Sequence, residues 1–357
     1  MNKIDFKSDY THGAHPKVLE RLVQTNMEST PGYGADGYCF KAAEKILQEC
    51  GCETGKVIFL SGGTQTNKLM VDAMLSQVEG VMCTPEAHIN VHEAGAIEAT
   101  GHKVLTIESV DGKLDAEAVD KYMTQFYADD TWPHMVIPGM VYISQPTELG
   151  TLYSLIELKR LREVCDKWKL KLYADGARLV YGLASPANNV SLKDMAEIFD
   201  SFYIGGTKAG LLFGEAVVIP RPEFFPHIFT LVKRHGSMLA KGRLLGLQFD
   251  TMFTDDLYKE MGQNAIAAAI SIRKAFVDKG WSPLSESYTN QQIFYLPNSA
   301  VEWLASVADF EIWGTPGKDV TAVRFVTDWA TTDGDVKALL DALKVSGSES
   351  LGMVEPA

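Results

Sequence analysis

The chain has 357 residues, 46% of them hydrophobic and 22% charged, with a net charge of −13 and a pI near 5.1. This composition is typical of a globular protein with a main domain and a smaller one, and the acidic balance argues against binding to a nucleic acid backbone, which needs clustered Lys and Arg. No apolar stretch is long enough to span a bilayer and residues 1–8 lack a signal peptide's apolar segment, so we expect a cytoplasmic protein that contacts no membrane.

Between residues 16 and 219, short apolar segments alternate with segments of helical periodicity. Strands are predicted at 57–60, 80–84, 103–107, 135–143, 171–173, 201–204 and 216–219. Helices are predicted at 16–26, 41–50, 64–78, 91–99, 115–126 and 154–168. This alternation is typical of βαβ units, so we expect an α/β fold with a mainly parallel central sheet flanked by helices.

The pattern changes near Gly246. Helices are predicted at 244–261, 265–279 and 333–343, and strands at 292–296, 310–313 and 322–325. This part favours a small C-terminal α+β domain. We therefore expect an N-terminal arm at 1–40, a large domain at 41–245, a small domain at 246–345 and a tail at 346–357.

Two residues with matching chemistry follow neighbouring predicted strands. Asp175 ends one apolar segment, and Lys208, framed by glycines, follows the next. Burial of a lysine lowers its pKa and makes the amine a nucleophile, while a nearby carboxylate can hold a protonated ring nitrogen. A lysine for a Schiff base and an acid for a pyridinium are the pair that a pyridoxal phosphate enzyme requires.

Other polar motifs also follow predicted strands. Ser61-Gly62-Gly63-Thr64 opens a helix, which is either a plain glycine-rich turn or a cradle for an anion at the helix N-terminus. His88 follows the strand at 80–84 and is either a local hydrogen-bonding group or a ring that stacks on a flat cofactor. His92 lies one helical turn beyond it, but no third ligand is near, so no metal site is predicted. Because ligands of open α/β sheets bind at the carboxyl ends of strands, we expect these groups to meet there.

The order of the motifs resembles that of fold type I pyridoxal phosphate enzymes, and within them the threonine aldolase and β-eliminating lyase group. The resemblance runs from about Ser8 to about Leu343. The motifs that carry it are Ser8-Asp9, Gly32-Tyr33-Gly34-Ala35-Asp36, Ser61-Gly62-Gly63-Thr64-Gln65-Thr66-Asn67, Ala87-His88 with Glu93-Ala94-Gly95, Tyr173-Ala174-Asp175-Gly176-Ala177-Arg178-Leu179, Gly206-Thr207-Lys208-Ala209-Gly210 and Arg324-Phe325-Val326-Thr327.

The resemblance implies the fold of aspartate aminotransferase and a role for each matched residue. The catalytic residues are Lys208, which carries pyridoxal phosphate as a Schiff base, Asp175 at the pyridinium nitrogen and His88 on the ring. Further cofactor-binding residues are Gly63, Thr64, Arg178 and Thr207. The substrate carboxylate is expected among Ser8, Arg178 and Arg324. Active sites of this group form at a subunit interface, so we expect a homodimer or homotetramer in which Tyr33 and residues 233–243 reach the neighbouring site.

The sequence departs from the family where the substrate's hydroxyl group is expected. The family has a Glu-Asn-Thr-His-Asn segment, but this chain has Ser144-Gln145-Pro146-Thr147-Glu148-Leu149-Gly150, so the second histidine is absent and Gln145 or Thr147 stands nearby. The family's Gly-Gly-Gly-Met-Arg-Gln is replaced by residues 235–243. The group that accepts the proton of the β-hydroxyl is therefore not identified by the sequence, and His88, His92 and a bound water are the candidates.

The leading hypothesis is retro-aldol cleavage of a small-molecule β-hydroxy-α-amino acid, such as L-threonine, to glycine and an aldehyde. The alternatives on the same scaffold are β-elimination, racemisation and transamination. A non-catalytic pyridoxal phosphate fold that binds or regulates is a different class, disfavoured because it does not need both Lys208 and Asp175. A nicotinamide-dependent dehydrogenase is disfavoured because no GxGxxG follows the first strand.

Overall fold

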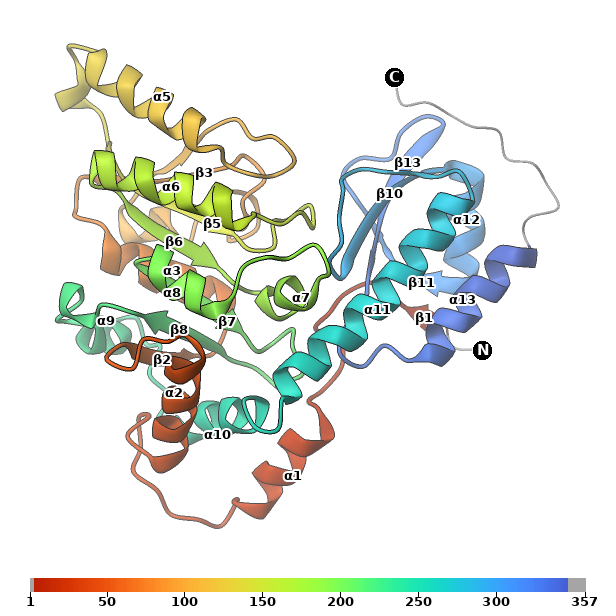
Figure 1. The fold of residues 1–357 in the computed structure, drawn as a ribbon, viewed down its shortest axis with the longest axis horizontal. Coiled ribbons are helices and arrows are strands. Elements are labelled where there is room, and N and C mark those ends of the chain that lie inside the picture. The colour runs from red at the N-terminus through yellow and green to blue at the C-terminus, as the bar shows by residue number, and fades with distance from the viewer. Residues whose placement is uncertain (1–2, 346–357) are drawn as a thin grey trace.

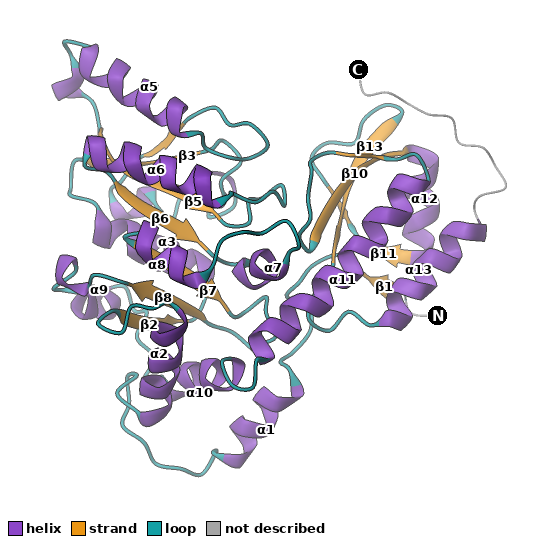
Figure 2. Ribbon diagram, viewed as in Figure 1, coloured by secondary structure: helices purple, strands orange, loops and turns teal. Residues whose placement is uncertain are grey.

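The computed structural model describes residues 3–345, and the predicted tail at 346–357 lies outside them. A large seven-stranded sheet and a four-stranded sheet form its two main parts (Figure 1; Figure 2), with a further pair of short strands. The strands are β1 Ile4–Asp5, β2 Lys56–Leu60, β3 Glu79–Cys83, β4 Val104–Thr106, β5 Ile137–Ser144, β6 Lys171–Asp175, β7 Ser201–Gly205, β8 Glu215–Ile219, β9 Ser282–Pro283, β10 Gln291–Pro297, β11 Ala308–Asp309, β12 Glu311–Ile312 and β13 Val320–Val326.

Helices cover both sheets. The α-helices are α1 Pro16–Gln24, α2 Gly37–Glu49, α3 Gly63–Met74, α4 His88–Val91, α5 Ala116–Ala128, α6 Leu155–Trp168, α7 Leu179–Ala184, α8 Leu192–Ile198, α9 Ile228–Arg234, α10 Arg243–Met252, α11 Leu257–Asp278, α12 Asn298–Val307 and α13 Asp333–Val345. Short 3₁₀ turns are η1 Glu98–Thr100, η2 Trp132–His134 and η3 Pro222–Phe224. No helix in the described part is long and apolar enough to cross a membrane.

The large sheet has the strand order β2-β8-β7-β6-β5-β3-β4. Its pairs are parallel except those of β8, which runs antiparallel to both β2 and β7. Alternate residues of its strands enter two separate cores: Phe202 and Ile204 pack on one side, and Tyr203 packs on the other. Because both faces are covered, the strands are apolar throughout, which is the pattern that made them predictable.

The four-stranded sheet has the order β12-β13-β10-β9 and packs with α11, α12 and α13 around a third core. The N-terminal arm joins this part of the molecule. Its strand β1 pairs parallel with β11, and Phe6 is fully buried in the third core. The arm therefore runs from the C-terminal part of the molecule to α1, which packs on α10. The domain boundaries drawn from the sequence stay a prediction.

Two predicted helices are wrong. The helix predicted at 244–261 is interrupted between α10 and α11, where Asp255 and Asp256 have positive φ angles of 52° and 57°. The helix predicted at 91–99 is replaced by α4, a turn and η1, since Ala94 and Gly95 also have positive φ. Left-handed residues cannot continue a right-handed helix. The strand predicted at 310–313 is shorter, because only β12 falls within that range, and β11 precedes it as a separate strand.

Candidate active site

The predicted strand-end motifs meet in one cavity of about 330 Å³ at the carboxyl edge of the large sheet. Strands β2, β3, β5, β6 and β7 all end at this edge, as their pairings require. The predicted site residues on the cavity wall are Gly63, Thr64, His88, Asp175, Arg178, Thr207 and Lys208. The parallel topology thus brings together groups that are distant in the sequence.

Asp175 is a buried carboxylate surrounded by neutral donors. Its Oδ1 accepts hydrogen bonds from the Tyr203 hydroxyl at 2.6 Å and the Ala177 N–H at 2.9 Å. Its Oδ2 accepts from the Tyr142 hydroxyl at 2.7 Å and the Asn67 amide at 2.9 Å. Burial alone raises a carboxyl pKa, but these donors outweigh it and hold the pKa of Asp175 below its ordinary value. The group therefore carries a negative charge at neutral pH.

Lys208 lies in the same cavity, on the turn after β7. Burial lowers the pKa of its ammonium group, and the nearby positive charge of Arg178 lowers it further. Glu215 also lines the cavity, and its carboxylate accepts hydrogen bonds from the Thr207 hydroxyl at 2.8 Å and the Gly206 N–H at 3.2 Å. Burial raises the pKa of Glu215 to about 8. A lysine of lowered pKa is more often the neutral, nucleophilic amine.

Helix α3 begins at Gly63 and points its N-terminus into the cavity. No side chain caps this end, so the amides of its first turn and the helix dipole are open to an anion. A Cβ atom on Gly63 would stand 3.2 Å from the Tyr203 hydroxyl, which is one of the donors to Asp175. Glycine at this position therefore leaves room for the Tyr203 hydroxyl that donates to Asp175.

His88 is tied to Asp175 through two further side chains. Its Nδ1 lies 2.8 Å from Oε1 of Glu93, which also accepts a 2.7 Å hydrogen bond from the Asn67 amide. The same Asn67 amide donates to Asp175. Glu93 is fully buried at its side chain, while that of His88 is 38% exposed. This chain of contacts fixes the orientation of the imidazole beside the cavity.

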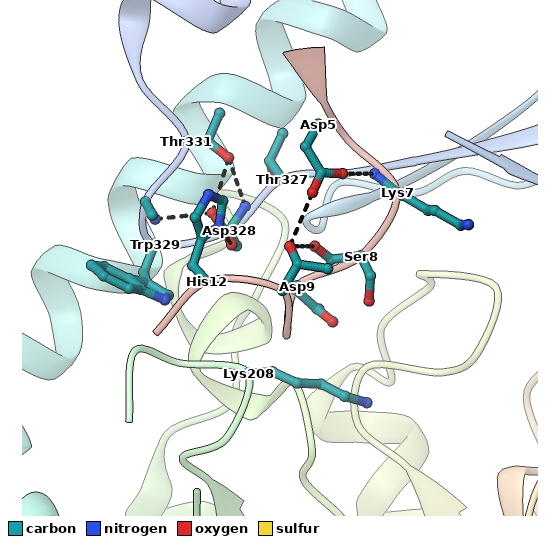
Figure 3. Close-up of polar contacts among 12 residues, drawn as sticks. Asp5, Lys7, Ser8, Asp9, His12, Lys208, Thr327, Asp328, Trp329 and Thr331 are labelled. Atoms are coloured by element: carbon teal, nitrogen blue, oxygen red, sulfur yellow. Dashed lines mark hydrogen bonds and ion pairs between the residues drawn. The ribbon is translucent and has the colours of Figure 1, made fainter. Parts of the chain in front are cut away.

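Arg178 is held by the N-terminal arm. Its Nε and Nη2 donate to the two carboxylate oxygens of Asp9, at 2.7 and 3.0 Å. Figure 3 shows the arm from Asp5 to His12 lying between Lys208 and the loop that carries Asp328. Nδ1 of His12 lies 2.7 Å from Oδ2 of Asp328. Asp9 also accepts from the Asn290 amide at 2.9 Å. The arm thereby links the cavity to the C-terminal sheet.

Three predicted site residues do not line the cavity. Ser8 is buried beside Asp9, and its Oγ has no hydrogen-bond partner among the described residues. Arg324 donates to Gln291 at 2.9 Å and to Glu311, while its Nε is likewise buried without a partner in that part of the chain. Tyr33 is half exposed, beneath the Lys233 ammonium, and borders a different cavity.

The segment that departs from the family pattern also lies at the cavity. Gln145 does not border it, because the amide exchanges hydrogen bonds of 3.0 and 3.1 Å with the backbone of Tyr153. Thr147 lines the wall, with its hydroxyl 2.7 Å from that of Thr151. Glu148 lines the wall as well. Of the side chains in this segment, Glu148 therefore brings an ionisable group to the cavity.

Several residues of the site were missed in the sequence. In the sequence, Tyr142 and Tyr203 look like core residues of strands, and Asn67 lies in a predicted helix. In the structure, all three side chains donate hydrogen bonds to Asp175. Glu215 stands at the start of a strand, whereas the other groups follow strand ends. Because β8 is antiparallel, its first residue reaches the same edge, opposite Gly205 and Leu60.

The geometry fits pyridoxal phosphate. A buried, charged Asp175 that has only neutral hydrogen-bond donors suits a pyridinium N–H, and the uncapped α3 N-terminus suits a phosphate. The buried amine of Lys208 lies in the cavity that contains both. The described residues contain no cluster of three or more metal-ligating His, Cys, Asp or Glu side chains.

Comparisons with known proteins show one family. The family described as beta-eliminating lyase matches residues 5–296. The chain is similar to threonine aldolase from Leishmania major, with 37% identity, a TM-score of 0.93 and coverage of 96% of this chain and 99% of that one. It is 26% identical to a low specificity L-threonine aldolase from Pseudomonas aeruginosa over 339 residues, 94% of this chain and 95% of that protein.

A more distant structure supports the fold alone. Aspartate aminotransferase from Thermus thermophilus superposes with a TM-score of 0.71 at 14% identity, covering 96% of this chain and 92% of that one. These findings confirm the predicted family, the fold class and the pyridoxal phosphate cofactor. The chain belongs to the beta-eliminating lyase family.

Proposed function

We propose that this chain is a pyridoxal phosphate-dependent aldehyde-lyase, which cleaves the Cα–Cβ bond of L-threonine and similar β-hydroxy-α-amino acids to glycine and an aldehyde. The observation that carries the proposal is the meeting of Lys208 and the charged, buried Asp175 in one cavity at the carboxyl edge of the sheet. Threonine aldolases from Leishmania major and Pseudomonas aeruginosa are among its relatives.

Four groups would hold the cofactor. Lys208 would bind it covalently, the first turn of α3 at Gly63 and Thr64 would receive its phosphate, and Asp175 would face its ring nitrogen. His88 would pack on the ring, oriented by Glu93. When bound, pyridoxal phosphate supplies an electron sink for the pair left on Cα.

The chain's own residues govern the protons of this reaction. Asp175 would favour a proton on the ring nitrogen of a bound cofactor, because its own pKa lies below the ordinary carboxyl value and its charge is desolvated. Burial lowers the pKa of the Lys208 amine, so this amine would be able to accept and return a proton at Cα of the substrate.

The substrate carboxylate has candidate partners at the edge of the arm. Ser8 Oγ and Arg324 Nε are both buried without partners in the described chain. The guanidinium of Arg178 already donates two hydrogen bonds to Asp9, which fix its position. Arg178 would therefore attract the substrate carboxylate by its charge. A planar guanidinium on a rigid strand is suited to holding a carboxylate, and Glu311 is the group that a substrate would displace from Arg324.

The proposal includes a homodimer or homotetramer. Tyr33 does not line the cavity of its own chain, and with residues 233–243 it would complete the site of a neighbouring subunit. Crosslinking of a cysteine introduced at Tyr33 to a cysteine in a second chain's cavity tests this arrangement. The cytoplasmic location and the domain boundaries stay predictions from the sequence.

Product analysis tests the reaction. The purified protein with pyridoxal phosphate is incubated with L-threonine, L-serine and, separately, an amino acid with a 2-oxo acid. We expect equal amounts of glycine and acetaldehyde from L-threonine. A 2-oxo acid with ammonia would indicate β-elimination, a D-amino acid would indicate racemisation, and amino-group exchange would indicate transamination. Any of these as the main product would overturn the proposal.

A further inference from the structure

A partly buried carboxylate lies at the cavity, in the segment where the chain lacks the histidine of the family pattern. Glu148 is carried by the turn after β5, and it faces the space that also contains Lys208 and Asp175. Sequence comparison with the family pattern shows only the loss of an imidazole. The structure shows that the same segment brings another group able to accept a proton.

The carboxylate of Glu148 is held in place at one oxygen. Its Oε1 accepts hydrogen bonds from the backbone N–H of His88 at 2.9 Å and from the Ser144 hydroxyl at 2.7 Å. Ser144 is the last residue of β5, and His88 follows β3 as the first residue of α4. Two donors on one oxygen fix the orientation of the carboxylate in the cavity wall. A general base must be held within hydrogen-bond reach of the proton that it accepts.

The other candidate bases have different partners. His88 has its Nδ1 on Glu93, and its ring is the group expected to pack on the cofactor. His92 does not line the cavity, and the charges that act on it are His88, Glu311 and Arg324. Asp175 accepts four hydrogen bonds from other residues.

Glu215, the remaining carboxyl on the wall, is bound to Thr207 and Gly206 on the turn that carries Lys208. It therefore lies at the lysine's side of the cavity. Glu148 lies across from it on a different strand end, bound to the backbone of His88. Among the described carboxyl groups of the cavity, Glu148 is thus the one attached to the segment that the family uses at the substrate's hydroxyl.

We propose that Glu148 is the catalytic residue that accepts the proton of the substrate's β-hydroxyl group, an inference that rests on the proposed function. The O–H bond breaks and its proton passes to the carboxylate, while the oxygen's electron pair forms the carbonyl of the aldehyde. The Cα–Cβ bond breaks and leaves its electron pair on Cα, which then receives a proton to give glycine. Atoms and charge balance because the proton that Glu148 returns to solvent is matched by the proton that Cα takes up through Lys208.

The electrostatic surroundings agree with this role. Burial raises the pKa of Glu148 above its ordinary value, and the charge of Asp175 adds to the effect. A carboxylate of raised pKa is a stronger base than an exposed carboxylate.

The test compares two reactions of the holoenzyme. Cleavage of L-threonine requires removal of the hydroxyl proton, whereas exchange of a glycine α-proton with deuterated water does not involve a hydroxyl. Glu148→Gln keeps an oxygen acceptor for His88 and Ser144. We expect it to lower kcat for L-threonine by about 10²–10⁴-fold, the usual contribution of a general base, and to change glycine exchange by less than about threefold. Glu86→Gln, whose carboxylate accepts from Ser109 outside the cavity, is the matched control with unchanged rates.

Each outcome decides between the two proposals. Near-normal threonine cleavage by Glu148→Gln overturns the role of Glu148, while the aldolase assignment stands. Equal loss of cleavage and glycine exchange also overturns it, because the residue would then act on the site as a whole. Glu148→Asp retains a carboxylate and should cleave threonine faster than Glu148→Gln; no gain contradicts the inference. If the wild-type protein exchanges glycine protons but does not cleave threonine, the proposed function itself fails.

Discussion

Asp9 and Arg178 form a two-point ion pair that joins the N-terminal arm to the wall of the cavity. The side chain of Asp9 is fully buried and that of Arg178 is 14% exposed. The sequence suggested Arg178 as a direct partner of substrate or cofactor. The structure shows that its guanidinium is engaged by the chain itself, so Asp9 sets both the position of Arg178 and the path of the arm.

Asp9→Asn should destabilise the protein. The change leaves the charge of Arg178 buried without a counter-charge, which typically costs about 3–5 kcal/mol of unfolding free energy. Burial alone raises the Asp9 pKa, but Arg178 and Lys208 lower it below its ordinary value. The stabilisation by Asp9 is therefore present above its unfolded pKa and is lost as the pH falls through the folded one.

Urea denaturation at pH 7 and at acidic pH, with pyridoxal phosphate present, measures this difference. Asp256→Asn is the control, because Asp256 is 73% exposed in its pair with Lys259 and should contribute no more than about 1 kcal/mol. Equal stabilities of wild type and Asp9→Asn at pH 7 would show that the ion pair does not support the arm.

Asp175→Asn should give a folded protein with slow turnover. A neutral amide no longer favours a proton on the ring nitrogen, and loss of one preorganised electrostatic partner typically lowers kcat by about 10²–10³-fold. The control is Asp194→Asn, which changes a capping residue of α8 that does not line the cavity, and the rate of acetaldehyde release from L-threonine is measured for both variants. A near-normal rate in Asp175→Asn would refute its assignment to the ring nitrogen.

Lys208→Ala should still bind pyridoxal phosphate but form no covalent bond to it. Borohydride reduction followed by mass spectrometry should attach the cofactor to the wild type and to Lys337→Ala, whose side chain is 80% exposed, but not to Lys208→Ala. A covalent adduct of unchanged yield in Lys208→Ala would place the Schiff base on a different lysine.

Glu215→Gln should change the pH dependence of stability. Because burial raises the Glu215 pKa from 4.5 to about 8, the folded state binds the extra proton in that interval and the wild type loses stability as the pH rises. Glutamine has no such proton, so the variant should gain relative stability from pH 5 to pH 8. Unfolding of the cofactor-free proteins is measured with Glu117→Gln on α5 as the control. A constant difference across this interval would show that Glu215 is ionised throughout.

Sequence reasoning located the part of the site that obeys a simple topological rule. Asp175 and Lys208 follow parallel strands, and such ends gather at one edge whatever their distance along the chain. Glu215 escaped this rule, because only the pairing of β8 shows that it runs the opposite way. The rule also does not identify buried tyrosines such as Tyr142. Its ring packs like that of any core residue, and only the structure shows that its hydroxyl donates to Asp175 on the neighbouring strand.

The errors in the fold have local causes. The apolar periodicity of α10 continues into α11, which favoured one helix, but Asp255 and Asp256 adopt left-handed conformations between them. Short polar side chains stabilise such turns by bonding to the nearby backbone. The pairing of β1 with β11 joins residues 4–5 to residues 308–309, and no local pattern could indicate a contact between segments so far apart in the sequence.

The most direct test of the central claim follows the bond that breaks. L-threonine labelled with ¹³C at both Cα and Cβ is incubated with the holoenzyme, and the products are observed by NMR. We predict that the coupling between the two labelled carbons disappears, as one label enters glycine and the other enters acetaldehyde. Products that retain this coupling, such as 2-oxobutyrate or D-allo-threonine, would show that the Cα–Cβ bond stays intact and would contradict the assignment.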